Sequence, residues 1–108
     1  MIAYIRLKDI LDIQTNFENA DFWIIRKGDA KKVGKPTRDF LSSHIGFRLN
    51  DVGKTILDPN YLYYVFEYLY GEGVWRQMAK GSLALQHITV SDAKNFSIPI
   101  QVPEGFGE

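Results

Sequence analysis

The feature that most constrains the fold is a helix signal over residues 58–69. Asp58 is a residue type that accepts hydrogen bonds from the free N–H groups at a helix start, and Pro59 suits the first helical position. Gly71 follows the expected end, where glycine commonly terminates a helix. The sequence therefore predicts one well-defined helix in the second half of the chain.

We expect this helix to be nearly all buried. Its apolar side chains form one stripe and its tyrosines a neighbouring stripe: Leu62, Val65, Phe66 and Leu69, and Tyr61, Tyr64 and Tyr68. Tyrosines at such positions suit base stacking or a cofactor site as well as packing. We favour packing in the core, because the rings bury apolar area while their hydroxyls reach the surface.

Short alternating or compact apolar segments predict strands around this helix. They cover residues 2–7, 22–26, 45–49, 83–90 and 96–100. A turn at 50–53 favours hairpin-like pairing with 55–57. We also expect a helical or bent segment at 9–13, a short helix at 74–80, and a turn of helix capped by Ser91.

This order of elements predicts an α+β fold: one compact domain with a curved, mostly antiparallel sheet packed on one main helix. A chain of 108 residues has room for one core. The domain is expected to span residues 1–100, and 101–108 to form a loose C-terminal tail with two glycines and a proline.

Composition favours a cytoplasmic protein. The chain has no cysteine, which excludes disulfides and thiolate chemistry, and no run of about 20 apolar residues that would span a membrane. Charge appears too early in residues 1–8 for a signal peptide.

The net charge of zero hides an uneven distribution. Residues 23–48 hold seven basic and two acidic side chains, so the rest of the chain holds six basic and eleven acidic ones. Such polarity suits a surface that contacts phosphates on one side, although a solvated lysine-rich loop at 31–38 has the same composition.

Motifs for catalysis are absent from the sequence. His44 and His87 lie far apart with no metal-binding spacing, and no nucleophile elbow, phosphate-binding loop or dinucleotide fingerprint occurs. Asp9 and Asp12 are three residues apart, and on a short helical turn they suit a solvated edge better than an acid–base pair. We therefore expect no enzyme activity, no cofactor and no metal.

Residues 81–100 resemble the end of a target recognition domain of type I restriction-modification specificity subunits. The family tail runs G-S/T, four residues and an isoleucine, then D-L-K-N, then a strand ending I-P. The matching positions are Gly81, Ser82, Ile88, Asp92, Lys94, Asn95, Ile98 and Pro99, with five residues instead of four between Ser82 and Ile88. Residues 4–15, 58–64 and 78–82 also resemble family segments in order and spacing, so that the resemblance covers most of residues 4–100.

The resemblance implies non-catalytic recognition of double-stranded DNA, with methyltransferase or restriction subunits as partners. Two departures qualify it. The region between Thr15 and Arg48 is shorter than in the family, and the spacer helix expected after Pro99 is missing before Glu108. A detached module, a homodimer or a derived protein would each fit.

Eight residues are candidates for DNA contact by charge and loop position. Lys31, Lys32, Lys35 and Lys54 suit phosphates, and Gln14, Arg26, Arg38 and Arg48 suit base edges. The alternative is a protein-interaction or anti-restriction module, carried by a phage or mobile element, that binds a partner subunit or another copy instead of DNA. Neutral net charge favours that alternative.

Overall fold

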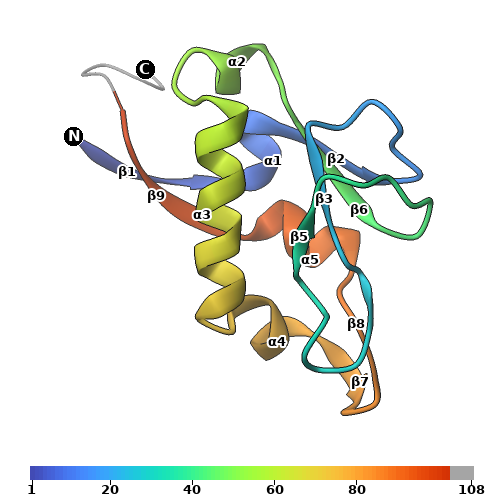
Figure 1. The fold of residues 1–108 in the computed structure, drawn as a ribbon. Helices are drawn as coiled ribbons and strands as arrows, with labels where there is room; N and C mark the ends of the chain where they lie inside the picture. The colour runs from blue at the N-terminus through green and yellow to red at the C-terminus, as the bar shows by residue number, and fades with distance from the viewer. Residues whose placement is uncertain (103–108) are drawn as a thin grey trace.

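The computed structural model describes residues 1–102 and shows an α+β fold in which every strand pairing is antiparallel. This confirms the predicted class. The strands are divided among three sheets, and the longest helix is α3 (Pro59–Gly71). In Figure 1 it crosses in front of β1 (Ile2–Arg6) and β9 (Ser97–Gln101), and the other strands lie beside and below it.

The central sheet has the strand order β2-β6-β3-β5. Its strands are β2 (Leu11–Thr15), β6 (Ile45–Leu49), β3 (Phe22–Ile24) and β5 (Pro36–Thr37). β2 follows a four-residue helix, α1 (Leu7–Ile10), so the segment expected to be bent is a helix and then a strand. Leu11 and Ile13 are buried while Asp12 and Gln14 are exposed, and this alternation is what a sheet with one buried face requires.

A second sheet pairs β1 (Ile2–Arg6) with β9 (Ser97–Gln101) in full register from Ile2 opposite Gln101 to Arg6 opposite Ser97. The third, called the small sheet below, has the order β4-β8-β7. It consists of β4 (Lys27–Gly28), β8 (Leu85–His87) and β7 (Lys80–Ser82). The expected strand over 83–90 is therefore limited to three residues.

The main helix begins as predicted. The Asp58 carboxylate accepts hydrogen bonds from the N–H groups of Asn60 and Tyr61, and Pro59 occupies the first turn. The helix continues through Gly71, and the glycine with a left-handed backbone is Gly73, at φ 74°.

Three shorter helices complete the fold: α2 (Asp51–Lys54), α4 (Val74–Met78) and α5 (Val90–Asn95). α2 replaces the hairpin turn expected at 50–57, because the Asn50 side chain accepts the Gly53 N–H and starts a helix. Thr89, not Ser91, caps α5 through its hydroxyl, which accepts the Asp92 N–H.

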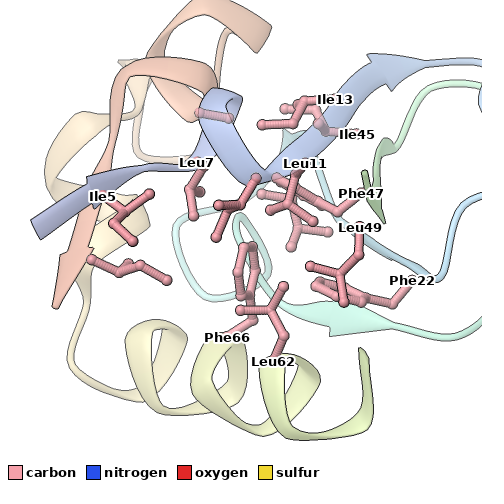
Figure 2. Packing of buried hydrophobic residues seen from close by; sticks show 14 of the residues in the cluster. Ile5, Leu7, Leu11, Ile13, Phe22, Ile45, Phe47, Leu49, Leu62 and Phe66 are labelled. Atoms are coloured by element: carbon pink, nitrogen blue, oxygen red, sulfur yellow. The ribbon is translucent and has the colours of Figure 1, made fainter. Parts of the chain in front are cut away.

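An aromatic cluster joins α3 to the central sheet. Phe66 packs edge-on against Phe22 and Phe47, with ring centroids 4.9 and 4.8 Å away. Figure 2 shows Leu62 and Phe66 pointing from α3 towards this sheet. Only Leu62 and Phe66 of the helix are buried, so the expectation of a nearly all-buried helix was wrong.

Residues 31–38 are not the fully exposed loop that their composition predicted. Val33 is buried and Gly34 packs against Trp75, where a Cβ atom would overlap the indole. Pro36 pairs with Ile24 in the central sheet. The side chains of Lys31, Lys32 and Lys35 stay exposed, because it is the residues next to them that pack against the core.

The end of the fold lies beyond the boundary expected at residue 100. Gln101 belongs to β9, and buried Val102 donates its N–H to the Met1 carbonyl oxygen. The remainder of the expected tail, residues 103–108, lies outside the described residues.

Candidate nucleic-acid interface

The small sheet gathers cationic side chains from two distant parts of the sequence. Lys27 of β4 lies opposite His87 of β8, and His87 lies opposite Lys80 of β7. Directly opposed residues of antiparallel strands point to the same face, and neighbouring strands are about 4.8 Å apart. The register thus makes a row of Lys27, His87 and Lys80 across the sheet.

Two lysines adjoin this row through a tight turn. The Asp29 carboxylate accepts hydrogen bonds from the backbone N–H groups of Lys31 and Lys32, at 2.9 and 3.1 Å. The Ala30 N–H donates to the Leu83 carbonyl oxygen at the tip of the β7–β8 hairpin. The turn that carries both exposed lysines is therefore tied to the small sheet.

The hairpin itself depends on Gly81. Its φ of +110° suits glycine, and an added Cβ would overlap the Leu85 carbonyl oxygen. The glycine of the G-S motif therefore has a structural role in bringing Lys80 opposite His87.

The row of Lys27, His87 and Lys80 is accessible to a ligand. Lys80 Nζ lies 3.9 Å from Asp92 Oδ2, but the Lys80 side chain is 63% exposed, so this ion pair constrains it weakly. Beside the row is a hollow of about 380 Å³ lined by Arg26, Lys27, Leu85, Gln86 and His87. Arg26 is anchored there, since its Nε donates to the Ser43 carbonyl oxygen at 3.0 Å.

A second hollow, of about 450 Å³, brings Gln14 and Arg48 together between β2 and β6. Lys8 of α1 and Lys94 of α5 also line it. Arg48 Nη2 lies 3.5 Å from Asp12 Oδ2, and its guanidinium carbon lies 5.2 Å from the centroid of the Phe17 ring. Carboxylate and ring together hold the guanidinium in place while its side chain remains 43% exposed.

The other predicted residues are not brought together. The Arg38 guanidinium lies 4.0 Å above the Tyr63 ring and 3.4 Å from Asn60 Oδ1, so it is docked on α3. Lys35 is exposed before β5, and its N–H donates to the Lys32 carbonyl oxygen. Lys54 is on α2, at the opposite end of the molecule from the small sheet in Figure 1.

Sequence reasoning missed five residues of these two clusters: Lys27, Lys80, His87, Lys8 and Lys94. Strand register, which depends on long-range pairing, creates the row on the small sheet. The G-S pair before Leu83 was the available sequence signal for Lys80, because glycine is the residue type that accepts the positive φ found at Gly81.

Within residues 1–102, no group of three or more His, Cys, Asp or Glu side chains is placed to hold a metal ion. In the same part of the chain, no helix has the length and apolar character needed to cross a bilayer. Burial lowers the pKa of His44, at the end of the loop before β6, from its ordinary value of 6.5.

The fold is similar to that of part of a restriction-modification S subunit, which confirms the fold expected from the resemblance. A similar solved structure is the crystal structure of the type I restriction-modification system S subunit from M. genitalium. It superposes on 93% of this chain with a TM-score of 0.70 and 16% sequence identity. This chain spans 34% of the length of that chain. Comparison of the sequence with protein families and with curated proteins gave no match.

Proposed function

We propose that this protein recognises double-stranded DNA without catalysing a reaction on it. The observation that carries the proposal is the row of Lys27, His87 and Lys80 on the small sheet, with the cationic Lys31 and Lys32 beside it. Duplex DNA carries about one negative charge per 1.7 Å of its axis, so a row of this extent meets several phosphates. The likeness in fold to a specificity subunit supports the same function.

The row on the small sheet and the hollow with Gln14 and Arg48 have different roles in this proposal. Exposed lysines on the small sheet suit phosphate contact, which fixes position and contributes affinity but reads no sequence. The hollow with Gln14 and Arg48 offers an amide and a held guanidinium, the groups that pair with adenine and guanine edges in the major groove. Lys8 and Lys94 at the same hollow suit flanking phosphates.

Partners follow from the same proposal. A module without catalytic groups needs other subunits for methylation or cleavage, so we assign those reactions to methyltransferase or restriction subunits. Two DNA half-sites would require a homodimer or a second recognition domain. Such an assembly would act in the cytoplasm.

The test is a fluorescence-anisotropy titration of randomised duplex DNA at low and physiological salt. Wild-type binding should weaken by roughly 0.9 log unit per log unit of salt for each phosphate neutralised. The double change Lys31→Glu/Lys32→Glu should reduce affinity by about tenfold or more and lower the salt slope by about one per lysine.

Two matched single charge reversals test whether the small sheet is the surface that contacts DNA. Lys27→Glu should weaken binding, whereas Arg6→Glu, an equal change on the exposed side of β1, should not. Equal losses from both changes would indicate attraction to overall charge and reject the small sheet as the contact surface. Absence of salt-sensitive binding by the wild type would reject the DNA function and leave the protein-interaction role.

Base reading is tested separately, by selecting preferred sequences from the randomised pool. Arg48→Lys removes the planar guanidinium but keeps the charge, so affinity for random DNA should hold while one preferred base is lost. A good bidentate contact discriminates against the wrong base by about 1–3 kcal/mol. An unchanged selected sequence would show that Arg48 does not read a base.

A further inference from the structure

The outward side of α3 exposes three tyrosines at successive turns. Tyr61, Tyr64 and Tyr68, called the tyrosine face below, are 60, 64 and 66% exposed. Tyr63 and Tyr70 of the same helix differ, because their hydroxyls donate to the carbonyl oxygens of Pro36 and Lys31. Among residues 1–102, the hydroxyls of the tyrosine face form no hydrogen bond.

Packing within the domain does not explain this face. The core side of α3 is filled by Leu62 and Phe66, which contact the central sheet (Figure 2). A run of large exposed aromatic side chains is a feature of surfaces that bind other proteins. Tyrosine supplies large contact area with few rotatable bonds and keeps a hydroxyl for hydrogen bonding.

A hollow of about 350 Å³ adjoins the tyrosine face between α3 and β9. Tyr61 borders it together with Ile56, Leu57, Val65 and Ile100. Apolar residues form most of the lining, Asp58 and Gln101 add polar surface to it, and the hollow is large enough for one apolar side chain of a partner. The hollow lies beside the tyrosine face and shares Tyr61 with it. A ligand lying along α3 would therefore contact both the tyrosine rings and the side chains of the hollow.

Charge decides which ligand suits this face. Residues 58–72 contain three acidic and no basic side chains: Asp58, Glu67 and Glu72, all exposed. Arg38 is docked on the same helix, but its contacts are with Tyr63 and Asn60 and not with the tyrosine face. Two copies pairing face to face would bring these acids together, and DNA phosphates would also be repelled. A basic ligand is attracted, and its guanidinium or ammonium groups can also stack on tyrosine rings.

We propose that the tyrosine face and the adjoining hollow bind a basic amphipathic helix of another protein. An apolar side chain of that helix enters the hollow between α3 and β9. Its arginines or lysines pair with Glu67 and Glu72 and stack on the tyrosine face. This surface uses none of the side chains of the small sheet.

The probe is a synthetic amphipathic peptide with leucines on one helical face and arginines on both flanks. A matched peptide carries glutamates in place of the arginines. Anisotropy of the labelled peptides should show binding of the arginine peptide alone. Tyr64→Ser/Tyr68→Ser should weaken it at least about tenfold, as truncation of interface hot spots does, and Glu67→Lys/Glu72→Lys should weaken it as well.

Tyr4→Ser is the matched control, since Tyr4 is a tyrosine 77% exposed on β1. It should leave peptide binding unchanged, and the tyrosine double variant should keep wild-type DNA binding and a wild-type melting temperature. No binding of the arginine peptide by the wild type, or equal binding of both peptides, would overturn the proposal. Self-association in sedimentation velocity that the double variant abolishes would assign the face to a second copy and also overturn it.

Discussion

The central sheet and the small sheet have the same antiparallel pairing but differ in how far their side chains are buried. In β6 of the central sheet four of five residues are buried, whereas all three residues of β7 in the small sheet are exposed. The face of the central sheet towards α3 is apolar, and the charged pair of Asp12 and Arg48 lies on β2 and β6 with partly exposed side chains. The small sheet has little apolar area to bury and carries Lys27, His87 and Lys80.

The contrast in burial shows where most of the stability must come from. Burial of apolar surface is the main source of stability, so the central sheet and α3 must contribute most of it. The small sheet is held by backbone hydrogen bonds and a glycine turn, and its side chains are free to meet a ligand. Four changes test this division, in order of decreasing expected effect on stability.

Phe66→Ala should have the largest effect. It removes a ring that packs against Phe22 and Phe47 and should cost about 3–5 kcal/mol in the free energy of unfolding. Chemical denaturation measures the loss. Tyr64→Ala on the exposed side of the same helix should stay within roughly 0.5 kcal/mol, and a loss as large as that of Phe66→Ala would contradict the division.

Gly81→Ala should have a local effect. Its positive φ and the close Leu85 carbonyl oxygen make the change cost about 1–3 kcal/mol within the small sheet. Hydrogen exchange should accelerate at the amides of β7 and β8 and stay slow in β6. Gly71→Ala is the opposite control: it lies in α3 with open space for a Cβ, so it should stabilise the protein by about 0.5–1 kcal/mol.

Asp12→Asn should change stability little. The Asp12–Arg48 ion pair joins two side chains that are 52 and 43% exposed, and such pairs contribute about 0–1 kcal/mol. The change frees the guanidinium, so we expect altered sequence selection with an almost unchanged unfolding midpoint. A large drop in the midpoint would mean that this edge of the central sheet also depends on charge.

His44 should make the smallest contribution, seen as a pH dependence. Burial lowers its pKa below 6.5 in the folded protein, so the unfolded chain binds a proton more readily. Stability should therefore fall as pH decreases from 6.5 through the lower, folded-state pKa. His44→Gln should remove part of that slope in melts between neutral and acidic pH, and an unchanged slope would assign the dependence to other groups.

Local chemistry made part of the fold predictable. Asp58 and Pro59 define the start of α3 by hydrogen bonding and a fixed backbone angle, which need no distant partner. The strand at 45–49 was predicted with the bounds that the structure has. The resemblance of residues 81–100 to a known family correctly indicated the fold.

What could not be predicted depends on contacts between distant residues. Both stripes of α3 are aromatic or apolar, so periodicity alone could not show that Leu62 and Phe66 face the core and the tyrosine face does not. β4 and β7 are two- and three-residue strands rich in Lys, Gly and Ser, and they exist only through pairing with β8. The charge count identified Lys31 and Lys32, but the row on the small sheet required the register.

The pairing of β1 with β9 also determines how this unit can be combined with other polypeptides. Ile2 lies opposite Gln101, and the Met1 carbonyl oxygen accepts the Val102 N–H, so the chain enters and leaves the described fold at one place. A unit of this kind can be spliced into a surface turn of a host protein without separating the two sides of that turn. It can equally be circularly permuted: a short linker would join the paired ends, and new termini could be opened at the exposed hairpin tip beside Leu83.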